Sequence, residues 1–250
     1  MDPVRTLLFV PAHRDRMIEK APDAGADGLL YDLEDSVPVD DRNTARQMLA
    51  DALTAPRSLP RYIRVNGIAD AGKDETDADL DAVVLADVDG IVLPKAQSVD
   101  DITWTAAEIE KHEQARGLDA GAFEIVPMIE SALGVQFAYD ILTASPRVTS
   151  VIIGSAQDGD LQTDLGADWS PEGTELLYAR SHILLAARAA GIDHPMDGVF
   201  LGLDDEAGLI QDSENARRLG YRGKTVIHPR QIEPVHGVFT PSEKELTYYR

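Results

Sequence analysis

Residues 124–153 read EIVPMIESALGVQFAYDILTASPRVTSVII, and this stretch decides the fold class. It starts with an apolar run that predicts a strand over 124–128. It continues with apolar residues at helical spacing over 132–142 and ends in a second strand-like run over 148–153. A strand, a helix and a second strand in this order are typical of a parallel sheet with a helical crossover.

The same unit repeats on both sides of this stretch. Further strands are predicted at 7–10, 28–31, 62–65, 90–93, 196–200 and 225–227. Further helices are predicted at 14–24, 44–53, 78–85, 99–116, 172–190, 206–219 and 230–235, and the polar segment 70–81 is predicted as a surface loop leading into a helix. Eight strands alternating with helices predict a closed (β/α)₈ TIM barrel over residues 1–236. Residues 237–250 are predicted to start a C-terminal extension that is shorter than in related chains.

A doubly wound open sheet is the alternative fold. It usually has fewer strands, and it often carries a glycine-rich phosphate-binding loop. The sequence contains neither a GxGxxG nor a Walker A pattern. The barrel is therefore the preferred fold class.

The composition excludes several classes of protein. The 250 residues carry 44 acidic and 23 basic side chains, a formal charge of −21, and such a surface repels nucleic-acid phosphates. There is no cysteine, so disulfides, thiolate metal sites and cysteine nucleophiles are excluded. No apolar run is long enough for a transmembrane helix, and the run at 7–10 is too short for a signal peptide. We therefore expect a cytoplasmic protein without nucleic-acid or membrane partners.

The acidic residues are mainly aspartate, and lysine is scarce. The chain has 29 Asp and only six Lys. This balance resembles proteins of salt-loving organisms, in which high salt screens the repulsion between like charges. An ordinary acidic protein is the alternative. In both cases most carboxylates are solvated, so a candidate site residue needs an argument from its position.

Polar side chains lie at or just beyond every predicted strand, where a (β/α)₈ barrel has its active site. These residues are His13, Asp32, Glu34, Asp35, Arg64, Asn66, Lys95, Glu130, Asp158, Asp160, Asp197 and His228. Carboxylates without cysteine suit Mg²⁺, which prefers oxygen ligands. Glu130 and Asp160 follow neighbouring strands and are the candidate metal ligands. Arg64 offers a permanent bidentate cation for a carboxylate or a developing enolate.

Four further residues have two interpretations each. Glu34 and Asp35 either support the metal waters and Arg64 or cap the next helix. Lys95 either orients a carboxylate or only pairs with one. His228 either makes a structural hydrogen bond or has a role near the site.

Eight segments in chain order resemble one known family. They are 5–11 (RTLLFVP), 31–37 (YDLEDSV), 63–66 (IRVN), 90–95 (GIVLPK), 127–131 (PMIES), 160–166 (DLQTDLG), 220–229 (GYRGKTVIHP) and 239–242 (FTPS). The chain resembles the citrate lyase β-subunit-like family of the HpcH/HpaI aldolase superfamily. The resemblance implies a Mg²⁺-dependent (β/α)₈ lyase that forms a homotrimer or homohexamer.

The resemblance also implies a reaction and roles. A 3-hydroxyacyl-CoA thioester of the malyl-CoA, β-methylmalyl-CoA or citramalyl-CoA type would be cleaved to an oxoacid and acetyl-CoA or propionyl-CoA. Glu130 and Asp160 would bind Mg²⁺ and Arg64 would contact the substrate and stabilise the thioester enolate. The turn before the second ligand, residues 154–160, is longer than the family pattern, so Asp158 is kept in reserve for Asp160. The C-terminal aspartate that malyl-CoA lyases lend to a neighbouring subunit has no match.

Two other functions stay open on this basis. The same site could hydrolyse malyl-CoA, as a thioesterase does. The chain could also be a citryl lyase subunit that depends on an acyl carrier protein and has no activity on free CoA thioesters.

Overall fold

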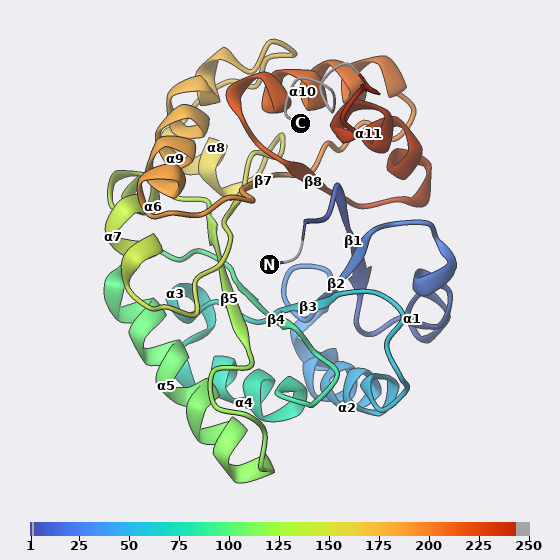
Figure 1. Cartoon of the computed structure of the whole chain (residues 1–250), viewed down its shortest axis with the longest axis vertical. Coiled ribbons are helices and arrows are strands. Elements are labelled where there is room, and N and C mark those ends of the chain that lie inside the picture. Colours follow the sequence, from blue (N-terminus) through green and yellow to red (C-terminus); the bar gives the residue numbers. More distant parts are fainter. Residues whose placement is uncertain (2, 244–250) are drawn as a thin grey trace.

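The structure is a computed structural model that describes residue 1 and residues 3–243. Eight parallel strands close into a barrel in the order β1 to β8, and each strand pairs with its sequence neighbours. Figure 1 shows the strands around the centre of the molecule and the helices outside them. The predicted TIM barrel is confirmed.

The strands are β1 (Thr6–Pro11), β2 (Gly28–Asp32), β3 (Arg61–Arg64), β4 (Gly90–Leu93), β5 (Glu124–Ile129), β6 (Ile152–Ile153), β7 (Met196–Asp197) and β8 (Gly223–Val226). The α-helices are α1 (Asp15–Lys20), α2 (Arg42–Leu53), α3 (Ile68–Ala71), α4 (Lys73–Val83), α5 (Val99–Arg116), α6 (Ala132–Gln136), α7 (Ala138–Thr143), α8 (Asp160–Leu165), α9 (Leu177–Ala189), α10 (Glu206–Leu219) and α11 (Ile232–Phe239). Short 3₁₀ turns lie at Ala21–Asp23, Val39–Asp41, Thr174–Leu176 and Pro229–Gln231.

The alternation of side chains along each strand divides the apolar residues into two cores. Leu7 and Leu30 belong to a small cluster inside the barrel, whereas Leu8 and Leu29 belong to the large cluster between the strands and the helices. Both faces of a barrel strand are therefore buried, which explains why the strands read as continuous apolar runs.

The expectation of a surface loop over 70–81 is wrong for most of that segment. Helix α4 begins at Lys73, and the two acidic residues of its first turn, Asp74 and Glu75, favour the positive end of the helix dipole. Thr76 and Asp79 on this helix are fully buried. The segment looked like a loop because its inward-facing positions are polar.

Other elements also differ from the expected bounds, and of the strands expected at 148–153 and 196–200 only Ile152–Ile153 and Met196–Asp197 are strands. The helix expected at 132–142 is divided at Phe137, whose backbone leaves the helical region. The helix expected at 172–190 starts at Leu177 because Gly173 has a left-handed φ of 62°. The long loop expected after β6 contains helix α8, which starts at Asp160.

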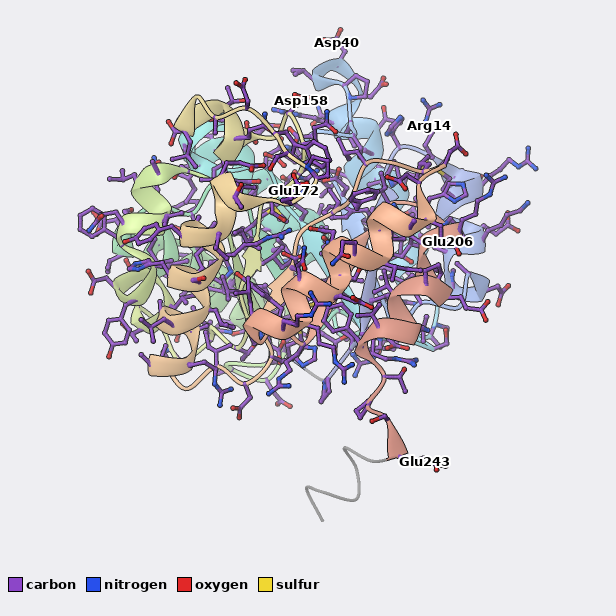
Figure 2. The ribbon with its side chains drawn as sticks, turned by 90° about the horizontal axis from the view of Figure 1, so that it is seen from above. Arg14, Asp40, Asp158, Glu172, Glu206 and Glu243 are labelled. Atoms are coloured by element: carbon purple, nitrogen blue, oxygen red, sulfur yellow. The ribbon has the colours of Figure 1, made fainter. Side chains whose placement is uncertain are left out.

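The loops that follow the strands gather at one end of the barrel. Figure 2 shows Asp158 and Arg14, which follow β6 and β1, at that end and Glu243 at the other. Helix α11 runs past residue 236, the expected end of the barrel domain, and residues 244–250 of the expected extension lie outside the described part. Within residue 1 and residues 3–243, no helix is long and apolar enough to cross a membrane.

Candidate active site

A cavity of about 420 Å³ opens where the strands end. Its walls combine apolar side chains, among them Phe9, Met128 and Ile152, with a few charged ones. A mostly apolar cavity with a small number of polar groups at the C-terminal end of a barrel is the usual form of a TIM-barrel active site.

Arg64 contributes a positive charge to this cavity from the last position of β3. Asp32, the last residue of β2, is its partner in the strand register. The guanidinium donates to Asp32 from Nε and from Nη2, both at 2.7 Å, and its Cζ lies 4.9 Å from the centre of the Phe9 ring. Burial alone would lower the pKa of Arg64, but the charge of Asp32 raises it. The side chain therefore stays charged and its orientation is fixed.

Glu130 follows β5 and is only 7% exposed. Its Oε1 accepts a hydrogen bond of 2.9 Å from the backbone N–H of Lys95. Gly154 packs directly against it, because a Cβ at that position would lie 2.4 Å from Cβ of Glu130. Burial and then the charge of Glu34 raise the pKa of Glu130 to about 8.

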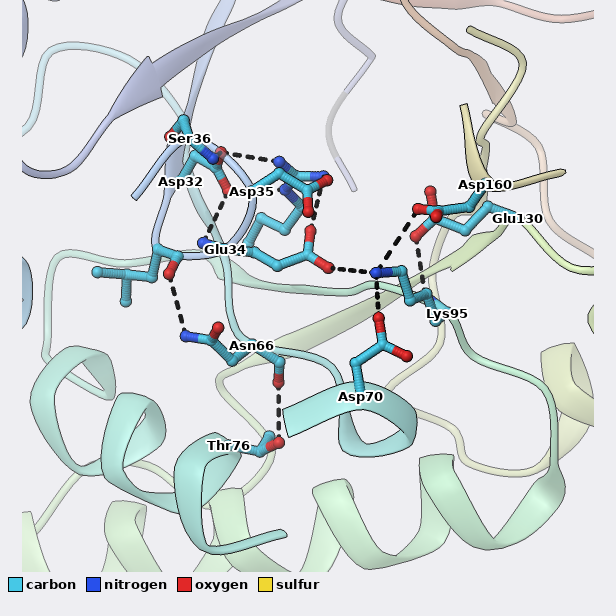
Figure 3. A network of polar contacts seen from close by, with 12 residues as sticks. Asp32, Glu34, Asp35, Ser36, Asn66, Asp70, Thr76, Lys95, Glu130 and Asp160 are labelled. Atoms are coloured by element: carbon cyan, nitrogen blue, oxygen red, sulfur yellow. Dashed lines mark hydrogen bonds and ion pairs between the residues drawn. The ribbon is translucent and has the colours of Figure 1, made fainter. Parts of the chain in front are cut away.

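Lys95 joins the acidic groups around Glu130. Its Nζ lies 3.3 Å from Oε1 of Glu34 and 3.6 Å from Oδ2 of Asp160, and it donates a hydrogen bond to Asp70. Figure 3 shows the carboxylates of Glu130 and Asp160 side by side, facing Lys95. Burial lowers the pKa of Lys95, but the hydrogen bond to Asp70 and the charge of Glu34 outweigh it and raise that pKa.

Glu34 is buried between two cations, with Oε2 2.8 Å from Nη1 of Arg64 and Oε1 facing Lys95. Among the residues that the structure describes, neither oxygen receives a hydrogen bond of good geometry. Burial, opposed by the charge of Arg64, raises the pKa of Glu34 to about 7. The charge of Asp35 adds to this rise.

These residues fit a hard divalent cation. Two carboxylates, Glu130 and Asp160, line the cavity, and burial raises the pKa of Glu130, so a bound cation there would favour its charged form. Within the described residues, no three His, Cys, Asp or Glu side chains converge tightly enough to hold a metal ion by themselves. Mg²⁺ does not require such a cage, because it typically takes one or two carboxylates and completes its shell with water and substrate oxygens.

The predicted site residues fall into three groups. Arg64, Glu130, Asp160 and Asp35 line the cavity, whereas Glu34 and Lys95 do not line it and contact these residues. Asp158 and His228 do not line it, although Gly159 and Ile227 beside them do. The backbone N–H of Asp158 donates to Gln162, and Nδ1 of His228 accepts from the N–H of Arg230, two residues along.

Asp197, expected among the polar strand ends, points away from the cavity. It is fully buried and pairs with Lys224 at 2.6 Å and with Arg180 at 3.3 Å. Arg180 also donates to Ser155, the residue after Gly154. The alternation along β7 explains the direction, since Met196 before it faces the barrel interior. This group of ion pairs therefore supports the loop that leads to Asp160, on the side of the loop that faces away from the cavity.

Asp79 was missed because it lies in the segment expected to be a surface loop. It accepts hydrogen bonds from the backbone and side-chain nitrogens of Asn66, at 2.6 and 2.8 Å, and from Arg46 at 2.6 Å. Asn66 in turn donates to the carbonyl oxygen of Leu33. Asp79 thus fixes the loops on either side of Arg64. The only signal in the sequence is the interruption of an acidic run by Thr76 and Leu80 at helical spacing.

Comparison with known proteins agrees with this arrangement. The family model described as HpcH/HpaI aldolase/citrate lyase matches residues 5–229. The citrate lyase subunit beta of Escherichia coli K12 is 38% identical over 98% of this chain and 80% of its own length. The (3S)-malyl-CoA thioesterase of Cereibacter sphaeroides KD131 is 34% identical, with the same coverage of both chains.

A solved structure is similar over nearly the whole chain. The protein CitE from Mycobacterium tuberculosis, in complex with magnesium, acetoacetate and coenzyme A, superposes with a TM-score of 0.79. It is 28% identical, and the match covers 99% of this chain and 85% of that one. The order of the motifs, the barrel and the family match agree, and the chain belongs to the HpcH/HpaI aldolase/citrate lyase family of enzymes.

Proposed function

We propose that this chain is a Mg²⁺-dependent carbon–carbon lyase acting on a 3-hydroxyacyl-CoA thioester. The substrate would be of the malyl-CoA, β-methylmalyl-CoA or citramalyl-CoA type, and the products an oxoacid and acetyl-CoA or propionyl-CoA. The observation that carries the proposal is the buried Arg64 guanidinium, fixed by Asp32 in the wall of the same cavity as Glu130 and Asp160.

The reaction breaks the bond between the carbinol carbon and the α-carbon of the thioester. The electron pair moves onto the thioester carbonyl oxygen, while the hydroxyl loses its proton and becomes the carbonyl of the oxoacid. Arg64 would stabilise the negative charge that develops on the thioester oxygen, and Asp32 would keep the guanidinium oriented. Protonation of the enolate α-carbon then yields acetyl-CoA or propionyl-CoA.

Glu130 and Asp160 would hold Mg²⁺ at the other side of the cavity. The ion supplies Lewis-acid polarisation of the oxygens on the acid half of the substrate. Glu130 is held for this role by the N–H of Lys95 and by its contact with Gly154. The similar structure, a complex with magnesium, acetoacetate and coenzyme A, supports a magnesium site in this fold.

The test is turnover of the three thioesters with and without Mg²⁺, with products identified by mass, at low and at high salt. We expect glyoxylate or pyruvate together with acetyl-CoA or propionyl-CoA, only when Mg²⁺ is present. Arg64→Lys and Glu130→Ala should lose at least about 100-fold in kcat/KM. Asp158→Asn is the matched control and should keep its activity, because the side chain of Asp158 does not line the cavity and asparagine tolerates its left-handed φ of 55°.

The same assay separates the two alternatives. Free malate and CoA without an oxoacid would indicate a thioesterase, which the similarity to the Cereibacter enzyme supports. Turnover only after citrate is presented on an acyl carrier protein would indicate a citryl lyase subunit, which the similarity to the E. coli subunit supports. A homotrimer or homohexamer is proposed from the family resemblance, and light scattering of the purified protein tests it.

A further inference from the structure

Lys95 contacts both candidate metal ligands, Glu130 and Asp160, although it follows a different strand from either of them. It follows β4, which pairs with β5, and its partner Asp70 lies in helix α3. Its backbone N–H donates to Oε1 of Glu130 at 2.9 Å, and its Nζ lies 3.6 Å from Oδ2 of Asp160. One residue therefore contacts the two ligands through two different groups.

The backbone of Lys95 adopts a conformation that L-amino acids rarely take. Its φ is +52°, and within residue 1 and residues 3–243 only Asp158 is another non-glycine residue with a positive φ. Such a conformation persists only where surrounding contacts require it. Here it directs the N–H to Glu130 while the side chain reaches Glu34 and Asp70.

The ammonium of Lys95 faces carboxylates and not the substrate. The side chain is 15% exposed and does not line the cavity. Glu34, one of its partners, is only 6% exposed. Among the described residues, neither of its carboxylate oxygens receives a hydrogen bond of good geometry. Arg64 is the other cation that contacts Glu34, so Lys95 and Arg64 together face the more numerous carboxylates of this group.

We propose that the Lys95 ammonium is a counterion built into the metal site. It stabilises the cluster of Glu34, Asp70 and Asp160 when no divalent ion is bound, and it lowers the affinity for Mg²⁺. Both effects follow from charge, because the ammonium attracts these carboxylates and would repel a divalent cation held by Asp160. The inference rests on the metal site of the proposed function.

Lys95→Gly isolates this role of the ammonium. Glycine keeps the N–H that binds Glu130 and adopts the left-handed backbone without strain, so that only the charge and the side chain are lost. Lys95→Arg retains the positive charge. Lys111→Gln is the control for the loss of one lysine, because Lys111 is 68% exposed and, among the described residues, pairs with Glu108 on its own helix.

Two measurements on the purified full chain test the proposal. In metal-free buffer of low ionic strength, the melting temperature of Lys95→Gly should fall below that of Lys111→Gln, and addition of Mg²⁺ should restore it. In calorimetric titration with Mg²⁺ alone, Lys95→Gly should bind on the order of tenfold more tightly than the wild type. Lys95→Arg should stay close to the wild type in both measurements.

Equal or weaker Mg²⁺ binding by Lys95→Gly would overturn the proposal, because the ammonium would then orient the ligands or do nothing for the metal. An unchanged melting temperature of the metal-free variant would overturn it as well. Absence of Mg²⁺ binding by the wild type would instead refute the metal site of the proposed function, and the melting temperatures of the metal-free variants would still decide whether Lys95 is the counterion of the cluster.

Discussion

Gly154→Ala introduces a single methyl group between the ends of β5 and β6. Its Cβ would lie 2.4 Å from Cβ of Glu130 and 2.7 Å from Oε2 of the same residue. The backbone cannot move away, because the N–H of Gly154 donates to the carbonyl oxygen of Ile129 at 2.9 Å. Glu130, with its Cβ as well as its carboxylate, is therefore the residue that must shift.

The size of the shift follows from the contact distance. Carbon atoms pack at about 3.5–4.0 Å, so Glu130 has to move by about 1 Å. Overpacking of this kind costs about 1–3 kcal/mol of unfolding free energy. A displacement of about 1 Å in a catalytic group lowers kcat/KM by about 100-fold, and we expect weaker Mg²⁺ binding in addition.

The assay combines urea unfolding, calorimetric Mg²⁺ binding and turnover of the best thioester. Gly237→Ala is the matched control, since no atom lies within 4 Å of its added Cβ and its helix α11 should gain up to about 1 kcal/mol. If Gly154→Ala bound Mg²⁺ and turned over substrate within twofold of the wild type, the contact with Glu130 would not position this carboxylate and our assignment of it would be refuted.

Three further outcomes are expected. Asp79→Ala leaves the buried backbone N–H of Asn66 without its acceptor and the side-chain amide with Leu33 alone, and should lower the unfolding free energy by about 2–4 kcal/mol in urea titrations; a loss below about 1 kcal/mol would contradict its positioning role. Asp197→Ala removes one of the carboxylates that pair with the fully buried Lys224 and should lower the unfolding free energy by about 3–5 kcal/mol. A variant that melts like the wild type would show that this ion pair does not stabilise the fold. The pKa of Glu130 is raised to about 8, above its unfolded value, so the metal-free fold binds more protons than the unfolded chain. The unfolding free energy of the metal-free protein should therefore fall as pH rises from about 4.5 to 8, and the affinity for Mg²⁺ should rise over the same range. Glu130→Gln should flatten the pH dependence of both quantities.

Most of the architecture could be predicted from local patterns. Strands with short apolar runs and helices with apolar residues three or four positions apart have different periods, and both periods can be read without knowing any distant contact. The barrel then places the ends of all strands together, which explains why Arg64, Glu130 and Asp160 were found in the wall of one cavity. The charge of −21 and the absence of cysteine also belong to the sequence alone.

The partners of these residues depend on the tertiary structure. Asp32 and Asp35 stand three positions apart and are identical in type, yet Asp32 is buried against Arg64 and the side chain of Asp35 is 61% exposed. Asp79 was hidden in an acidic segment because its burial depends on Asn66 and Arg46, 13 and 33 residues away.

The dependence of a residue's partners on the tertiary structure is clearest for Lys95. Its three carboxylate partners lie after β2, in helix α3 and at the start of helix α8, and the closed barrel brings them around one ammonium. Charge and hydrogen-bonding capacity are properties of a residue type, but burial and the direction of a side chain are set by neighbours distant in the chain. The sequence by itself therefore determined the barrel and the residues at its mouth, and the tertiary structure decided which of them meet, which stay charged and which turn away.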